Sequence, residues 1–332
     1  MTDNQKILQK REEELDSDED QNLLQKPKWV PISKRKEWED VVPITQKDGP
    51  KPPCVVNYSD QYKETMNYFR AVLRSEEISE RALKLSKELL MISPSYTVAY
   101  EFRRNCLFAL NGNLKNELFL IEKLLDRLPK NYQLWHHRMK CVEKLNDYSN
   151  EMDFLARMML GDAKNYHVWV YRIWLVKHFQ LWDNELEFIE GELEKDHLNN
   201  SFWNYRYYVV TKSKTIPLET IYEQEFEFVF GHITKSVNNE SPWVYIMNFI
   251  KILNKEQLKV LHDKVDELRK RHRYSMWPLF CLFTLYTKYL ITEENLDNAL
   301  TYAKYLAERY DQTRKKYWGK QIKIVENQKQ KL

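Results

Sequence analysis

Apolar residues recur along most of this chain with the three- and four-residue spacing of an amphipathic helix. In YKETMNYFRAVL, the apolar residues on one helical face are Tyr62, Met66, Phe69 and Leu73. The pair Ser59-Asp60 just before them is a good N-cap, and SERALKLSKELLMI at 79–92 again opens with a capping serine. The pattern predicts a succession of helices that begins near residue 59.

Bulky aromatic residues mark a repeat of about 34 residues along this helical region. Spaced by 35, 34, 34, 40 and 34 residues, they are Tyr100, Trp135, Trp169, Trp203, Trp243 and Trp277. The loop TKSKTIP at 211–217 accounts for the gap of 40. Helix pairs of this length cannot bury their apolar faces alone, but stacked copies can. We therefore predict an all-α fold, a right-handed superhelix of antiparallel helical hairpins.

The residues before the repeats differ in composition. Residues 1–28 are acidic and poor in apolar groups, which predicts a disordered tail. Residues 29–58 are rich in proline and hold two tryptophans, which predicts an extended arm anchored by Trp29, Trp38, Val41, Val42 and Ile44. The repeat domain is then expected over 59–332.

Charge and cysteine content exclude several classes of protein. The net charge is +3, with −5 in residues 1–22 and +8 diluted over the remainder, so no nucleic-acid binding is predicted. The four cysteines lack metal-ligand spacing, so no metal site is expected in this chain. The longest apolar run, at 276–286, falls short of the ~20 residues of a membrane span. We expect a soluble, cytoplasmic protein with no membrane insertion.

An arginine follows three residues after the aromatic in the first four repeats, at Arg103, Arg138, Arg172 and Arg206. Residues i and i+3 share one side of a helix. We interpret this pair as architecture, with the aromatic ring between successive hairpins and the arginine bonded to carbonyls or carboxylates at the junction.

A Lys-Asn-Tyr step precedes the tryptophan twice, in PKNYQLWHHR at 129–138 and AKNYHVWVYR at 163–172. Equivalent turns of stacked hairpins lie side by side, so Lys130 and Lys164 are expected to be neighbours at two helix N-termini. Exposed N–H groups, the helix dipole and the ammonium groups favour an anion there, and Tyr132 and Tyr166 add phenol donors. Solvated lysines beside packed tyrosines are the simpler alternative, and no nucleophile-and-base pair accompanies the motif.

The motif Pro-x-x-Tyr-x-x-Trp-x-x-Arg, present as PKNYQLWHHR and nearly intact as AKNYHVWVYR, resembles the prenyltransferase alpha-subunit repeat. With LWDNEL, NNSFWNYRY and the upstream WEDVVPITQKDGP, the likeness to the alpha subunit shared by protein farnesyltransferase and type I geranylgeranyltransferase covers roughly residues 35–255. Tyr100 departs from the pattern because a tryptophan is expected there, which puts packing at the first junction in doubt.

The resemblance implies a heterodimer with a beta subunit that holds Zn²⁺, with Mg²⁺ on the isoprenoid diphosphate. It implies transfer of a farnesyl or geranylgeranyl group to the cysteine of a C-terminal CaaX motif in proteins such as small GTPases. The roles that carry over are catalytic for Lys130, Tyr132 and Tyr166, and substrate-binding for Gln133, Asn165, His167 and Lys164. Of these residues, Lys164 is the one to which the resemblance assigns only a more distant charge. In particular, Lys130 would contact the diphosphate and Gln133 the carboxylate of the acceptor peptide.

Two alternatives remain at this point. The alpha subunit of the Rab-type geranylgeranyltransferase shares the repeats, and a tetratricopeptide scaffold shares the 34-residue period. The sequence does not say which beta subunit is the partner, and therefore which isoprenoid is transferred. The acidic tail is either regulatory or solubilising.

Overall fold

The computed structural model describes residues 29–47, 49–50, 54, 56–213 and 218–332. The predicted disordered tail at 1–28 lies outside these described residues, and the domain boundaries expected near residues 28 and 58 stay predictions. The chain divides into two compact units, Met1–Phe179 and Gln180–Leu332, which we describe separately. The regular elements in the described ranges are helical, with no β-strand among them, which confirms the all-α prediction.

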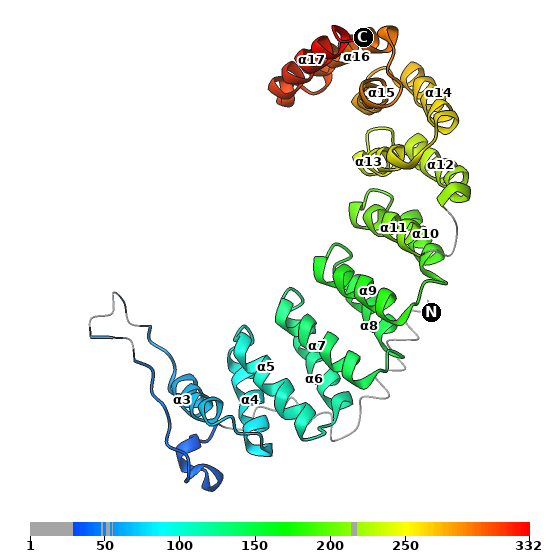
Figure 1. The fold of residues 1–332 in the computed structure, drawn as a ribbon. Helices are drawn as coiled ribbons and strands as arrows, with labels where there is room; N and C mark the ends of the chain where they lie inside the picture. The colour runs from blue at the N-terminus through cyan, green and yellow to red at the C-terminus, as the bar shows by residue number, and fades with distance from the viewer. Residues whose placement is uncertain (1–28, 48, 51–53, 55, 214–217) are drawn as a thin grey trace. The chain divides into compact units, whose positions relative to one another are not determined.

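In the first unit, consecutive helices pack side by side as antiparallel pairs (Figure 1). Two short 3₁₀ turns, η1 (Ile32–Lys34) and η2 (Lys36–Trp38), precede them. The helices are α3 (Asp60–Arg74), α4 (Glu80–Ile92), α5 (Thr97–Ala109), α6 (Leu114–Arg127), α7 (Tyr132–Leu145), α8 (Glu151–Gly161) and α9 (Tyr166–Phe179). The helices of each repeat form the hairpins α4–α5, α6–α7 and α8–α9. We call the loop inside each pair a hairpin turn and the loop between pairs a connecting turn.

The second unit continues the same arrangement. Its helices are α10 (Glu185–Lys195), α11 (Asn200–Lys212), α12 (Leu218–Lys235), α13 (Glu240–Phe249), α14 (Lys255–Arg271), α15 (Met276–Lys288), α16 (Glu293–Tyr305) and α17 (Lys315–Lys329). Shorter elements are η3 (Ile250–Ile252), the π-helical η4 (Leu306–Tyr310) and η5 (Gln312–Arg314). The loop predicted at 211–217 begins later than expected, because α11 runs through Lys212, and residues 214–217 lie outside the described part of the chain.

Helix ends follow the local chemistry of the sequence. Ser59 caps α3 by accepting from the Tyr62 N–H at 3.2 Å, as its position predicted. The connecting turns after α5 and α7 each contain an asparagine in the left-handed conformation, Asn111 at φ 51° and Asn146 at φ 53°. After Asn111, a side chain at Gly112 would approach Leu107 to 2.9 Å, so glycine permits this tight turn.

The aromatic residues of the repeat lie between hairpins, as predicted. The Trp135 ring is buried, with its centroid 5.6 Å from that of Phe154 on α8 and 5.5 Å from that of Tyr171 on α9. Trp203 packs in the same way against Tyr245 on α13, at 5.4 Å. These rings fill the junctions, so their burial stabilises the stacking of hairpins rather than single helices.

Arg103, Arg138 and Arg206 of the motif each belong to a buried triad. Arg138 on α7 donates two hydrogen bonds to Glu151 on α8, at 2.8 and 2.7 Å, and Tyr171 on α9 donates a third at 2.6 Å. Arg138 also donates to the Leu118 carbonyl of α6 at 3.2 Å. The same arrangement joins Arg206, Glu225 and Tyr245. This confirms the predicted role of the arginine in architecture.

The triad of the first junction differs in one member. Arg103 donates to Glu117 at 2.8 Å, and His137 takes the place of the tyrosine, with Nε2 2.7 Å from the same carboxylate. Burial would raise the pKa of Glu117, but the charge of Arg103 and the bond from His137 bring that pKa well below its usual value. Burial lowers the pKa of His137 despite the carboxylate beside it, so its ring is neutral.

A second set of bonds links the hairpin turns. The Pro129 carbonyl accepts from the Trp135 indole N–H and from the Asn165 amide of the next hairpin turn, both at 2.9 Å. At the first turn the Tyr100 hydroxyl donates to the Pro94 carbonyl at 2.8 Å, and the Asn131 amide donates to the same oxygen at 2.7 Å. Tyr100 therefore replaces the tryptophan donor, which resolves the doubt about packing at the first junction.

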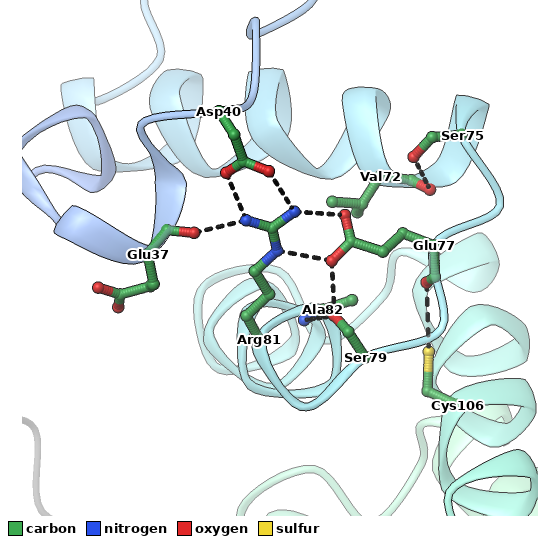
Figure 2. Close-up of polar contacts among 9 residues, drawn as sticks. All are labelled: Glu37, Asp40, Val72, Ser75, Glu77, Ser79, Arg81, Ala82 and Cys106. Atoms are coloured by element: carbon green, nitrogen blue, oxygen red, sulfur yellow. Dashed lines mark hydrogen bonds and ion pairs between the residues drawn. The ribbon is translucent and has the colours of Figure 1, made fainter.

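The arm before α3 is held to the first helices through Arg81 on α4. The Arg81 guanidinium bonds both oxygens of Asp40, both oxygens of Glu77 and the Glu37 carbonyl (Figure 2). Its Cζ lies 5.1 Å from the centroid of the buried Trp38 ring. Trp38 is thus an anchor as predicted, whereas Val42 is wrong as an anchor because its side chain is 83% exposed. The arm contains the turns η1 and η2 and is not extended throughout.

Membrane insertion gains no support from the helices. In the ranges that the structure describes, none is both long enough and apolar enough to span a bilayer.

Candidate functional site

The site predicted from the sequence is built on two adjacent hairpin turns of the first unit. The turn before α7 contains Lys130, and Asn131 caps that helix by accepting from the N–H groups of Gln133 and Leu134, at 3.0 and 3.4 Å. The expectation that exposed N–H groups at this helix start bind an anion is wrong for these two donors, because the cap already occupies them. The positive groups left for an anion are the ammonium and the helix dipole.

Lys130 is held loosely at the edge of this turn. Its side chain is 76% exposed, and its Nζ lies 3.6 Å from a carboxylate oxygen of Asp162, which follows α8. The other oxygen of Asp162 accepts the backbone N–H of Lys164 at 3.0 Å. Asp162 therefore bridges the two turns, as expected for neighbouring turns. An exposed pair at this distance is weak, roughly 0.2–1 kcal/mol, so an incoming anion can take over the ammonium.

Asn165 and His167 fix the second turn against the first. The Asn165 side chain is buried; it donates to the Pro129 carbonyl and accepts the His167 N–H at 2.9 Å. Direct contact of this amide with a substrate would require it to leave both bonds, so the geometry gives Asn165 a positioning role. Burial lowers the pKa of His167, and the backbone of Lys130 opposes that shift as a hydrogen-bond partner of the ring.

Both tyrosines of the motif face solvent. The Tyr132 side chain is 62% exposed and that of Tyr166 is 72% exposed, which is unusual for large aromatic residues in a chain whose other motif rings are buried. Gln133 is half-buried at the start of α7, and Lys164 is exposed. The structure thus places Lys130, Asp162, His167 and the backbone of Lys164 together, with the two exposed tyrosines on the same pair of turns.

Sequence reasoning missed several residues that the structure makes central. Asp162 was not considered, although an aspartate just before Ala-Lys-Asn-Tyr is a typical turn residue. The buried glutamates of the triads were also missed. Their signal was the dipeptide Asn-Glu at 116–117 and again at 150–151, each 13 or 14 residues after the motif arginine.

The part of the chain that contains these two turns is similar to proteins of known function. The family model of the protein prenyltransferase alpha subunit repeat matches residues 114–145 and 148–179. These ranges correspond to α6–α7 and α8–α9, so each matched repeat has one of the two lysine-bearing turns at its centre.

Similar proteins include the alpha subunit of protein farnesyltransferase/geranylgeranyltransferase type-1 from Arabidopsis thaliana, 46% identical over 97 residues. The subunit of the same name from Dictyostelium discoideum is 51% identical over 83 residues. These alignments cover 29% and 25% of this chain, and only 30% and 26% of the two relatives.

Among solved structures, Candida albicans protein geranylgeranyltransferase-I complexed with GGPP contains a similar chain. The TM-score is 0.76 at 28% identity, and the match covers 88% of this chain and 99% of that one. The structural likeness therefore extends over 88% of this chain, whereas the alignments of higher sequence identity cover less than a third of it.

Proposed function

We infer from its membership of the protein prenyltransferase alpha-subunit repeat family that this chain is the alpha subunit of a heterodimeric protein prenyltransferase. The reaction proposed is transfer of a farnesyl or geranylgeranyl group from its diphosphate to the cysteine thiol of a C-terminal CaaX motif. A thioether forms as the carbon–oxygen bond to the diphosphate breaks. The observation that carries the proposal is the exposed Lys130 ammonium, weakly held by Asp162 on the same pair of turns as two exposed tyrosines.

Lys130 acts on the leaving group in this proposal. Negative charge grows on the diphosphate as the bond breaks, and an ammonium aimed at that charge stabilises the transition state more than the ground state. The weak ion pair with Asp162 keeps Lys130 near the turn without neutralising it permanently. Tyr132 and Tyr166 are proposed to donate phenol hydrogens to the same oxygens.

The remaining site residues are assigned to binding and positioning. Gln133 at the start of α7 is proposed to bind the carboxylate of the acceptor peptide, and His167 is proposed as a further substrate-binding residue. Asn165 acts through the Pro129 carbonyl, since it holds the Lys130 turn beside the next one. Lys164 is assigned only a more distant charge, because only its backbone N–H reaches Asp162.

The proposal assigns its metal ions to the other components of the enzyme. In the part of the chain that the structure describes, no group of three or more His, Cys, Asp or Glu side chains is arranged to hold a metal. We assign Zn²⁺, which would supply a thiolate nucleophile, to the beta subunit, and Mg²⁺ to the diphosphate. The residues of this chain then orient the diphosphate and contribute positive charge.

The test is transfer of labelled farnesyl or geranylgeranyl diphosphate to a CaaX peptide by this chain co-expressed with a prenyltransferase beta subunit. Replacing Lys130 by alanine should lower kcat by about 10²–10³-fold, the usual effect of losing one transition-state donor. The complex should still form, because the side chain is exposed.

Lys115→Ala is the matched control. Lys115 is 74% exposed and pairs with Asp147 at 3.7 Å, nearly the geometry of Lys130 with Asp162, but it lies at the start of α6, next to a connecting turn. Equal activity of the wild type and Lys130→Ala would remove Lys130 from the mechanism. A stable complex that transfers to no CaaX peptide would favour the Rab-type enzyme, and the absence of any complex would favour a non-catalytic scaffold.

A further inference from the structure

A second cationic site lies far along the chain from Lys130, in the second unit. A hollow of about 280 Å³ opens where the C-terminal end of α14 meets α15 and α16. The cationic residues that line it are Arg269, Lys270 and Arg273, His272 lies between them in sequence and also lines it, and no acidic residue does. Its other walls are Ser275, Leu279 and three tyrosines. We call this hollow the C-terminal basic pocket.

The charges of the C-terminal basic pocket are not balanced by the carboxylates around it. Arg269 and Lys270 share the single carboxylate of Asp266, each at 2.8 Å. Arg273 is exposed and forms no ion pair with any residue that the structure describes. A concave surface with excess positive charge concentrates anions, and guanidinium groups bind phosphate oxygens through paired hydrogen bonds.

The pocket is also ordered before any ligand arrives. The Tyr310 hydroxyl donates to the Arg273 carbonyl at 2.8 Å, which fixes the loop that carries Arg273. The guanidinium of Arg269 lies 5.8 Å from the centroid of the Tyr302 ring, so one cation already packs against an aromatic wall. Together with the buried Leu279, this wall offers apolar contact beside the charged groups.

We propose that the C-terminal basic pocket binds the phosphate group of a small phosphomonoester. The charged side receives the phosphate, and the wall of Tyr302 and Leu279 receives the attached organic group. The volume is close to the smallest ligand pockets, about 300 Å³, which favours a small molecule over a long chain. This site is independent of the proposed transfer reaction and of Lys130.

The test is equilibrium dialysis of the full chain against labelled inorganic phosphate and, separately, phenyl phosphate. Both probes are used on a Lys130→Ala background, so that binding at the Lys130 turn does not contribute. We expect saturable binding of one probe molecule per chain, with phenyl phosphate about tenfold tighter than the bare ion because it also covers the apolar wall.

Arg273→Gln should weaken binding of both probes by about tenfold or more, as expected for losing a charged hydrogen-bond donor. Arg271→Gln is the matched control, since Arg271 is two residues away, 65% exposed and paired with Glu267 outside the pocket. Equal losses in both variants would reduce the effect to general surface charge and overturn the proposal. Absence of saturable binding, or equal affinity for the two probes, would overturn it as well.

Discussion

The buried junctions between hairpins and the exposed hairpin turns come from the same 34-residue motif, yet they use charge in opposite ways. At the junction, Arg138 and Glu151 are nearly inaccessible to solvent, and a tyrosine hydroxyl and a backbone carbonyl complete their bonding. At the turn, Lys130 is mostly exposed and meets one carboxylate at 3.6 Å. The junction charge is satisfied within the chain, whereas the turn charge is left available.

This difference separates stability from function within one repeat. Removing one partner of a buried ion pair leaves the other charge unpaired in the protein interior, which solvates it poorly. The folded state then loses much of its stability. Removing an exposed charge costs the fold little, and its effect appears only when a ligand needs it. A variant at a junction should therefore lower the free energy of unfolding, whereas a variant at Lys130 should lower activity and leave stability nearly unchanged.

The largest effect is expected at the junction. Glu151→Ala leaves Arg138 buried without its carboxylate and removes the acceptor of Tyr171, so the free energy of unfolding should fall by about 3–5 kcal/mol. Denaturant unfolding of the full chain measures this loss. The comparison fails if Glu151→Ala is as stable as Lys130→Ala, which should match the wild type.

A smaller loss is expected for the amide that links the turns. Asn165→Ala removes the bond to the Pro129 carbonyl and the acceptor of the His167 N–H, which should lower the unfolding free energy by about 1–2 kcal/mol. It should also reduce kcat with little change in KM, since the Lys130 turn loses its support.

Asn165→Asp keeps the acceptor but not the donor, and it should fall between alanine and the wild type in thermal unfolding. Wild-type kcat in the alanine variant would show that Lys130 is positioned without Asn165.

The first junction should respond to pH in a way that the second does not. Burial depresses the pKa of His137 in the folded state, so the unfolded chain binds the proton more readily, and stability present above pH ~6.5 is lost as the pH falls. The loss approaches about 1.4 kcal/mol per pH unit for this one group.

Replacing His137 by tyrosine copies the second junction and should remove that part of the pH dependence between pH 6.5 and 5. Unfolding free energies measured across this range provide the check. An unchanged slope in His137→Tyr would assign the acid sensitivity to other groups, such as His232, whose pKa burial lowers to about 4.

The smallest effect is expected at Asp162. Asp162→Asn keeps an oxygen for the Lys164 N–H but removes the charge beside Lys130. Since an exposed pair is worth roughly 0.2–1 kcal/mol, affinity for the isoprenoid diphosphate should rise up to about fivefold. Competition binding of the diphosphate measures this change, and weaker binding would mean that Asp162 supports Lys130 instead of competing for it.

The parts of the fold predictable from sequence were those that repeat. The period of the aromatic residues located the hairpins, and the arginine three residues later indicated a contact at the junction. Both could be predicted because they recur at a fixed spacing in the sequence. The partner of that arginine was not predictable from the motif alone, since Glu117 and Glu151 lie on a different helix and each resembles an ordinary surface glutamate in sequence.

The sequence predicted the charged residue of the candidate site, Lys130, better than the residues that hold its turn in place. Lys130 stands out because a lysine at a helix start is exposed in nearly any packing. Asn131 and Asn165 were harder to assign, because a cap asparagine and a ligand-binding asparagine look alike until the acceptor is known. The structure supplies that acceptor in the carbonyls of Pro94 and Pro129.

The bond between successive hairpin turns also sets where the repeat tolerates extra length. The donor amide and acceptor carbonyl lie 36 residues apart for Asn165 and Pro129, but 42 residues apart for Asn239 and His197, and both bonds measure 2.9 Å. The additional residues lie in α12, which has 18 residues where α8 has 11, so the bond between the turns forms whatever the length of the second helix. Peptide tags or reporter domains inserted at a connecting turn should therefore leave the spacing of the hairpin turns intact.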